Sequence, residues 1–260
     1  MRTNQLIAFM KNIFLCLVIV LMSARLPEQS LPLRLAVAAN AQFVIKALQA
    51  DFKKKTGIET EAVIGSSGKL AAQIKNGAPY DLFLSADMEF PETLFKDGLG
   101  ATAPKEYASG NLIVCSKSGL DLKNWRALLT QESIRKIALA NPALAPYGKA
   151  AEQALRHYGL WDGVKAKLVY GESISQVNTY ITTGTVELGF TSESLVYEHP
   201  EKEKLQWARV DGSVYEKIRQ GFLVLRHARE GNYAKALQFS EYLSSPAAKQ
   251  ILKRSGYQTP

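Results

Sequence analysis

Four turns in the sequence carry hydroxyl, amide or glycine groups directly before an amphipathic helix, and this placement suits the binding of an anion. The turns contain Ala39-Asn40, Ser66-Ser67-Gly68, Tyr147-Gly148 and Ser173-Ile174. The first backbone N–H groups of a helix have no partner within the helix, and the helix dipole adds partial positive charge there. If the four turns converge, the sequence predicts a site for a small anion that is held by neutral hydrogen-bond donors.

Each turn by itself also has a purely structural explanation. Serine and asparagine before a helix commonly cap it, and Ser173 with Gln176 three positions later fits a capping box. Tyr147 fits a half-buried aromatic residue with its hydroxyl in water. Lys69 and Lys149 lie near two of the turns but are expected on the solvated faces of their helices. The anion hypothesis therefore depends on all four turns meeting in one place.

Strands and helices alternate with short turns from Leu33 onward, which predicts an α/β fold with mostly parallel sheets flanked by helices. The expected strands are 33–38, 59–64, 81–85, 112–115, 136–140 and 186–190, and a further apolar segment covers 222–225. The expected helices are 43–55, 67–76, 149–158, 174–183, 233–243 and 246–253. Ligands of open α/β sheets bind beyond the carboxyl ends of the strands, where the four turns fall.

Two similar halves of this pattern predict two lobes that face a cleft. The chain is expected to cross between them near residues 113 and 220, so that 32–113 with 221–260 form lobe 1 and 114–220 form lobe 2. The ligand would then lie in the cleft, with two of the four turns contributed by each lobe.

The N-terminus has the pattern of a secretory signal peptide. Arg2 and Lys11 precede the apolar run 13–22, and Ser23-Ala24 follows it as a cleavage site, which predicts a signal peptide over residues 1–24 and export to the periplasm. The apolar run is too short to span a bilayer. Apart from Cys16 in this run, the sequence has one cysteine, Cys115, which is expected to pack as a small hydrophobic residue without a disulfide.

The formal net charge of +8 does not indicate a nucleic-acid partner. The basic run Lys53–Lys55 falls late in an expected helix, where cations complement the dipole, and no aromatic residues are interleaved with it. A cytosolic ligand-sensing domain is disfavoured by the leader and by the lack of a DNA-reading helical module before residue 32.

Two other functional classes, a hydrolase and a binding site for a metal cation, fit the sequence less well than anion binding. A hydrolase would combine Ser67 with a histidine and an aspartate, but no G-x-S-x-G motif surrounds any serine. The candidates for those partners are His157, His199, His227, Asp81 and Asp87. A site for a metal cation would need clustered histidine, cysteine or carboxylate ligands, which are scattered in this sequence. No enzymatic activity is therefore predicted.

Several segments resemble those of the periplasmic molybdate-binding proteins of ABC importers. They are Ala38-Ala39-Asn40, the turn 65–68, the segment 73–87 and the segment 141–148, and the likeness spans residues 32–260. The resemblance implies a type II periplasmic-binding-protein fold, molybdate or tungstate as the ligand, and no cofactor. It also implies delivery of the ligand to an ABC transporter permease in the inner membrane. A monomer is the default for such a shuttling receptor.

The resemblance also implies which residues bind the oxyanion. The contacts of the family fall on Asn40, Ser67, Tyr147 and the backbone at Ile174, and further candidates are Ala39, Ser66, Ser173 and Ser192. Many members have serine in place of Asn40, and some have a tyrosine where this sequence reads Gly189-Phe-Thr-Ser192, so a contact from Thr191 or Ser192 stays open. Molybdenum would be bound only as the oxyanion, without direct metal ligands.

Neutral donors suit a doubly charged tetrahedral anion. Removing water from a dianion is costly unless its oxygens regain hydrogen bonds, and bonds to charged groups contribute roughly 1.5 to 3 kcal/mol each. A donor-only site disfavours phosphate, whose proton needs an acceptor, and a wider cage disfavours the smaller sulfate. Sulfate, thiosulfate and phosphate remain the alternative ligands within the same fold.

Overall fold

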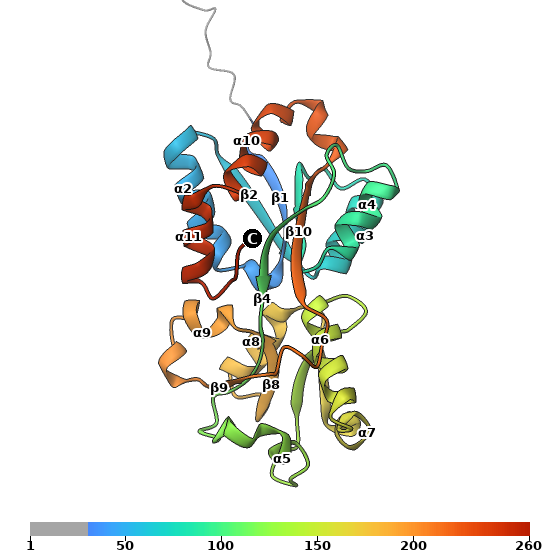
Figure 1. Ribbon diagram of the computed structural model, residues 1–260, viewed down its shortest axis with the longest axis vertical. Helices are drawn as coiled ribbons and strands as arrows, with labels where there is room; N and C mark the ends of the chain where they lie inside the picture. The colour runs from blue at the N-terminus through green and yellow to red at the C-terminus, as the bar shows by residue number, and fades with distance from the viewer. Residues whose placement is uncertain (1–30) are drawn as a thin grey trace, which may run out of the picture. The chain divides into compact units, whose positions relative to one another are not determined.

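Two five-stranded sheets organise the part of the chain that the computed structural model describes, residues 31–260 (Figure 1). The first sheet has the order β2 (Thr60–Gly65), β1 (Leu33–Ala38), β3 (Leu82–Leu84), β10 (Ile218–Val224), β4 (Lys105–Gly110). The second has the order β7 (Leu168–Gly171), β6 (Ile137–Ala140), β8 (Leu188–Ser192), β5 (Leu112–Ser116), β9 (Gln206–Arg209). We call each sheet with its helices a lobe, lobe 1 and lobe 2, and the two-lobed α/β architecture is as predicted. The predicted signal peptide lies outside the described residues.

The sheets are mixed rather than mostly parallel. In lobe 1, β1 pairs in parallel with β2 and β3, whereas β10 pairs antiparallel with β3 and β4. Lobe 2 repeats this arrangement, with β6 parallel to β7 and β8, and with β5 antiparallel to β8 and β9. The strands with antiparallel partners lie next to the two connections between the lobes. At one connection β4 continues through Asn111 into β5, and at the other β9 is followed by β10. From here on, lobe 1 and lobe 2 follow the sheets, which places 218–220 in lobe 1 and 112–113 in lobe 2. The domain ranges expected from the sequence stay a prediction.

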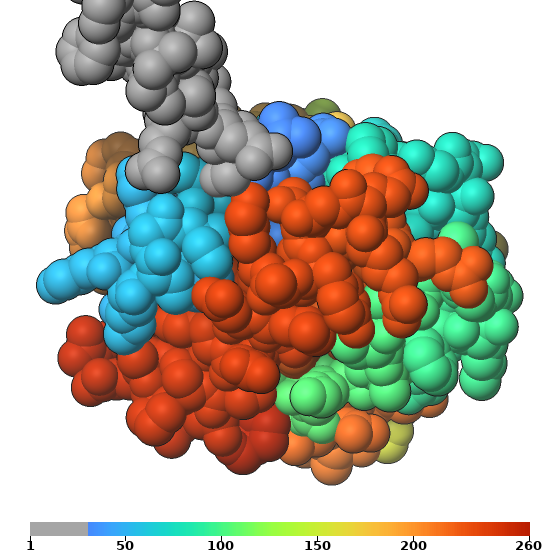
Figure 2. All heavy atoms as spheres, turned by 90° about the horizontal axis from the view of Figure 1, so that it is seen from above, coloured from blue at the N-terminus to red at the C-terminus, as the bar shows by residue number. Residues whose placement is uncertain are grey.

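Helices cover both faces of each sheet. Those of lobe 1 are α2 (Val44–Thr56), α3 (Ser67–Lys75), α4 (Glu89–Lys96), α10 (Tyr233–Leu243) and α11 (Pro246–Arg254). Those of lobe 2 are α5 (Trp125–Leu129), α6 (Pro146–His157), α7 (Trp161–Val164), α8 (Ile174–Thr182) and α9 (Ser194–Glu198). Figure 2 shows blue α2 beside the red C-terminal helices, and their buried residues share one hydrophobic cluster, so early and late parts of the chain complete lobe 1 together.

The predicted helices are present, and their ends have local causes. Gly57 and Gly184 end two helices with φ of 73° and 70°, a left-handed conformation that glycine adopts without steric cost. Helix α6 begins at Pro146 rather than at Lys149, because proline is well suited to the first helical position. This shift places Tyr147 inside the first turn of α6. The predictions omitted β4, β7 and β9.

Candidate functional site

A small pocket lies where the turns of the two lobes meet. Nine residues line it: Ala38, Ala39, Asn40, Ser66, Ser67, Ala86, Pro146, Tyr147 and Ile174. The first six belong to lobe 1 and the other three to lobe 2, and none of the nine has a charged side chain. The structure therefore brings together Asn40, Ser67, Tyr147 and Ile174, with Ala39 and Ser66 beside them. Their contact with a ligand stays a prediction.

Three helix N-termini contribute to this pocket. Ser67 is the first residue of α3, Tyr147 the second of α6 and Ile174 the first of α8. An N–H at these positions has no acceptor within its own helix, and the dipoles of the three helices add partial positive charge. The pocket thus gathers backbone donors from both lobes without using a lysine or arginine.

Two hydroxyl groups in the pocket are held so that their protons remain for a ligand. Ser67 Oγ accepts a hydrogen bond from the backbone N–H of Ala86 at 3.0 Å, and Tyr147 Oη accepts one from Nε2 of Gln220 at 3.2 Å. Since each oxygen already accepts from the protein, its own O–H group can donate outward. Burial raises the pKa of Tyr147 well above its ordinary value, so this hydroxyl keeps its proton at neutral pH.

Asn40 is buried, and its amino group points to the protein. Nδ2 donates to Oε1 of Gln220 at 3.0 Å and to Oη of Tyr257 at 3.3 Å. Its backbone carbonyl accepts from Ser194 Oγ at 3.0 Å and from Tyr257 at 2.8 Å. Within residues 31–260, Oδ1 of Asn40 and Oγ of Ser66 are buried without a hydrogen-bond partner. The side-chain donor of Asn40 is therefore already engaged, which leaves its backbone N–H as the donor toward a ligand.

The remaining candidates do not line the pocket. Ser173 caps α8, where its side chain accepts from the N–H of Gln176 at 3.4 Å. The reciprocal bond of a capping box is displaced by one residue, because Gln176 Oε1 accepts from the N–H of Glu172. Ser192 Oγ lies 2.9 Å from Ser194 Oγ, and the Thr191 hydroxyl donates to the side chain of Asn178.

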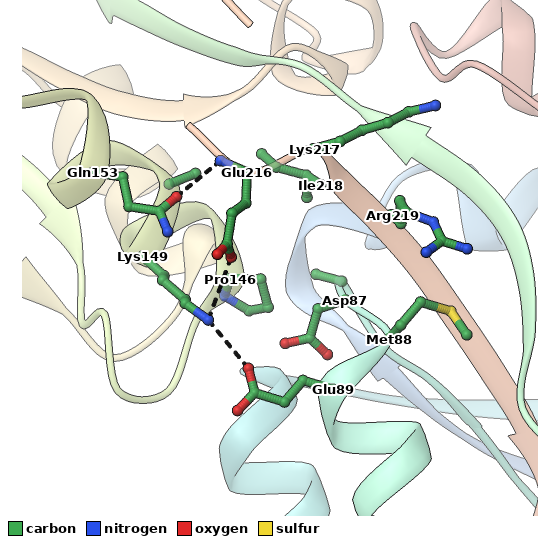
Figure 3. Close-up of a pocket in the computed structure, with 12 residues that line it drawn as sticks. Asp87, Met88, Glu89, Pro146, Lys149, Gln153, Glu216, Lys217, Ile218 and Arg219 are labelled. Carbon is green, nitrogen blue, oxygen red and sulfur yellow. Dashed lines mark hydrogen bonds and ion pairs between the residues drawn. The ribbon is translucent and has the colours of Figure 1, made fainter. Parts of the chain in front are cut away.

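Polar contacts cross from lobe 1 to lobe 2 around the pocket. The N–H of Gly68 donates to the carbonyl of Leu144 at 2.9 Å, and Lys69 pairs with Glu172 at 2.8 Å. Figure 3 shows Lys149 of α6 between Glu89 at the start of α4 and Glu216, with N–O distances of 3.2 and 3.6 Å. Lys69 and Lys149 therefore join the lobes instead of facing only solvent, although both remain about half exposed.

The pocket in Figure 3 lies next to the neutral one. It shares Ala86 and Pro146 with that pocket, and charged side chains of both signs surround it, among them Asp87, Glu89 and Lys149. Asp87 accepts from the Ser85 hydroxyl at 2.9 Å and from the N–H of Phe90 at 3.2 Å. Burial raises the pKa of this carboxyl group.

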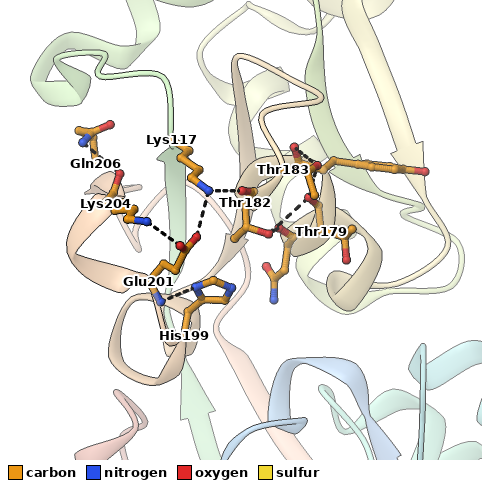
Figure 4. A network of polar contacts seen from close by, with 10 residues as sticks. Lys117, Thr179, Thr182, Thr183, His199, Glu201, Lys204 and Gln206 are labelled. Atoms are coloured by element: carbon orange, nitrogen blue, oxygen red, sulfur yellow. Dashed lines mark hydrogen bonds and ion pairs between the residues drawn. The ribbon is translucent and has the colours of Figure 1, made fainter.

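Two residues considered for a hydrolase, His199 and Asp81, serve local structure. Nδ1 of His199 accepts from the N–H of Glu201 within a turn of lobe 2, beside the pair of Glu201 with Lys117 (Figure 4). Hydrogen bonds from Lys204 and Lys117 lower the pKa of Glu201 to about 2. Asp81 accepts from the N–H of Arg34 at 2.8 Å. These bonds give no support to a catalytic group at Ser67, whose hydroxyl contacts Ala86 instead.

The described residues contain neither a cluster of metal ligands nor a membrane-spanning helix. Between residues 31 and 260, no group of three or more histidine, cysteine or acidic residues is arranged to hold a metal ion. Within the same range, no helix combines the length and the apolar character that a membrane span requires.

The sequence interpretation missed the residues behind the pocket, above all Gln220, Tyr107 and Tyr257. Gln220 is fully buried, and Tyr107 and Tyr257 are almost so. Gln220 stands two positions before the apolar segment 222–225, inside strand β10, whose first four residues that segment leaves out. Tyr107 lies on β4, which was not predicted at all.

The comparisons with known proteins agree with this architecture. The family described as "Bacterial extracellular solute-binding protein" matches residues 33–258. Molybdate-binding protein ModA of Azotobacter vinelandii is 37% identical over 231 residues, covering 88% of this chain and 90% of its own. ModA of Rhodobacter capsulatus is 33% identical over 239 residues, 92% of each chain. The solved structure of the Azotobacter vinelandii periplasmic molybdate-binding protein has a TM-score of 0.82 at 33% identity, covering 88% of this chain and 99% of the other. The chain therefore belongs to the family of bacterial extracellular solute-binding proteins.

Proposed function

We propose that this protein captures molybdate or tungstate in the pocket between the lobes and delivers it to an ABC transporter permease. The observation that carries the proposal is the lining of the pocket: three helix N-termini and two outward-donating hydroxyls, without a charged side chain. Relatives named for molybdate binding, at 37% and 33% identity, support the identity of the anion.

The ligand contacts in this proposal come from both lobes. Ser67 and Tyr147 each give a hydroxyl and a backbone N–H, Ile174 gives a backbone N–H, and Asn40 contributes through its backbone. Together with Ser66, these donors reach about six to eight hydrogen bonds, which could support the roughly 8 to 12 kcal/mol that corresponds to micromolar to nanomolar binding.

We also propose how the protein is exported and where it acts. A signal peptide over residues 1–24 directs the protein to the periplasm, where it works as a monomer and as a carrier, not as an enzyme. The family and the word "periplasmic" in the name of the Azotobacter vinelandii structure support this location.

Calorimetry and thermal unfolding with a panel of anions test the proposal. Protein purified after expression of the complete sequence is titrated with molybdate, tungstate, sulfate, thiosulfate and phosphate. A ligand at a hundred times its dissociation constant adds about 2.7 kcal/mol of stability, a rise in Tm of roughly 5 to 10 °C for a chain of this size. We expect this rise for molybdate and tungstate. A larger rise with sulfate or phosphate would assign the pocket to that anion instead.

A further inference from the structure

Gln220 connects the two lobes directly behind the pocket. It lies on β10 of lobe 1, is fully buried, and contacts Asn40 of lobe 1 and Tyr147 of lobe 2. A β-bulge at this point lets Gln220 pair with Ala108 and Gly221 with Glu106, so that Tyr107 is the extra residue of β4. Bulges redirect side chains, and this one brings the amide of Gln220 together with the hydroxyl of Tyr107.

The two ends of the Gln220 amide have different partners. Oε1 accepts from Nδ2 of Asn40 at 3.0 Å and from Oη of Tyr107 at 2.9 Å, whereas Nε2 donates to Oη of Tyr147 at 3.2 Å. Burial raises the pKa of Tyr107 well above its ordinary value, so it stays a donor and needs an acceptor here. Two donors therefore hold the carbonyl end of Gln220 in place, and this leaves the amino end facing Tyr147.

The orientation of this amide determines whether the Tyr147 hydroxyl can donate a hydrogen bond into the pocket. With Nε2 toward it, the tyrosine oxygen accepts from the protein and its proton is free for the pocket. With the amide reversed, the Gln220 carbonyl would take the tyrosine proton and leave only a lone pair toward an anion. We propose that Gln220 is a positioning residue for the oxyanion site: it directs the Tyr147 proton into the pocket while it holds the Asn40 amino group away from it.

This inference rests on the proposed function, and a double-mutant cycle tests it. Gln220→Glu keeps the shape and the acceptor for Asn40 and Tyr107 but replaces the donor toward Tyr147 with a second acceptor. In the wild type, Tyr147→Phe should raise the Kd for molybdate about tenfold or more, since a bond to a charged group is lost. In the Gln220→Glu background, the same change should raise it less than about threefold, because the hydroxyl proton has turned to the carboxylate.

Ser67→Ala is the matched control for the added charge. The carboxylate weakens anion binding in general, but the Ser67 hydroxyl is oriented by Ala86, so the cost of Ser67→Ala should be equal in both backgrounds. Gln49→Met controls for the loss of a partly buried side-chain hydrogen bond far from the pocket. The Gln49 amide donates only to the Thr60 carbonyl, at 3.0 Å. It should leave the Kd unchanged.

Gln220→Met provides a second, uncharged background should Gln220→Glu fail to fold, as judged by circular dichroism. There the cost of Tyr147→Phe should fall at least about threefold below its wild-type value, because the hydroxyl is no longer held. Equal costs of Tyr147→Phe with and without Gln220 would overturn the inference. That result is distinct from failure of the proposed function, in which the wild type itself does not bind molybdate.

Discussion

Ser67 has a single hydrogen bond at its hydroxyl group, which accepts from the backbone N–H of Ala86. Within residues 31–260 no acceptor bonds to the hydroxyl proton, so this proton is available for a ligand. Ser67→Ala should therefore weaken molybdate binding about tenfold or more, the loss of one hydrogen bond to a charged group. Calorimetry measures the effect, and Tm without ligand should fall by only a few degrees. Ser118→Ala, at an exposed serine, is the control, and an unchanged Kd for Ser67→Ala would remove this residue from the site.

Gly110 makes room for the Tyr147 hydroxyl. A Cβ atom at this position would lie 1.9 Å from Tyr147 Oη and 2.9 Å from Gln220 Nε2. Gly110→Ala should thus displace the hydroxyl, destabilise the fold by about 1 to 3 kcal/mol and raise the Kd for molybdate about tenfold. Denaturant unfolding and calorimetry measure the two effects.

Gly163→Ala is the control for this substitution. Gly163 lies on α7, and a Cβ there would meet nothing within 4 Å. It should leave both the affinity and the stability nearly unchanged. Equal behaviour of the two alanine variants would contradict the role given to Gly110.

Cys115 is buried on β5, and burial raises the pKa of its thiol to about 12. The free thiol titrates near 8.5, so the folded state favours the neutral form, and this contribution to stability is complete below pH 8.5 and is lost as the pH rises toward 12. At pH 8 in a Cys16→Ser background, the folded protein should react with a thiol reagent at least a hundredfold more slowly than in guanidinium. Equal rates would contradict the burial of this residue.

The elements that position the site were predictable to different degrees. The spacing of the apolar residues predicted the bounds of α3, α8 and α10 to within one residue, because these helices are amphipathic. Gly77 and Gly184 mark the ends of α3 and α8. The strands β4, β7 and β9 were missed. All three are edge strands with partly exposed residues, so their sequences lack the continuous apolar run of a central strand.

The candidate site likewise contains residues that could be predicted from the sequence and residues that could not. Its lining comes from turns between a strand and a helix, and such turns can be recognised locally from Asn40, Ser67 and Ile174. The layer behind it joins Gln220 to Tyr107, which are 113 positions apart, through a bulge between two antiparallel strands. No local pattern records that pairing, and therefore the orientation of the donors could not be predicted.

Two exposed ion pairs, Lys69–Glu172 and Lys149–Glu89, cross between the lobes, and we expect them to give molybdate binding a small dependence on salt. Lys149 of α6 pairs with Glu89 of α4, and about half of the lysine side chain and more of the glutamate are exposed. Pairs this exposed contribute little, so Lys149→Met should raise the Kd for molybdate by less than about threefold, and the effect should vanish at 1 M salt.

Lys75→Met is the matched control, because Lys75 pairs with Asp97 at 2.8 Å within lobe 1. It should not change the Kd at any salt concentration. A loss in affinity much larger than threefold for Lys149→Met would mean that this lysine contacts the anion, contrary to a neutral site.

At the scale of residues 32–260, the donors of the pocket are divided between two lobes that the chain joins at only a few places, around Asn111 and between β9 and β10. An anion that bonds to Ser67 in one lobe and to Tyr147 and Ile174 in the other is held fully only when the lobes are in contact. The ligand therefore binds that state more tightly and shifts the population toward it.

Small-angle scattering measures this shift. Without ligand, the protein should show a larger radius of gyration than with saturating molybdate. The same concentration of sulfate, which we expect the pocket not to bind, should leave the value at that of the free protein. The Gly110→Ala variant, whose Tyr147 hydroxyl is displaced, should need proportionally more molybdate to reach the same change. Superimposable profiles with and without molybdate, in samples where calorimetry shows the site filled, would mean that the lobes are already fixed in contact and that the donors are preorganised rather than assembled by the anion.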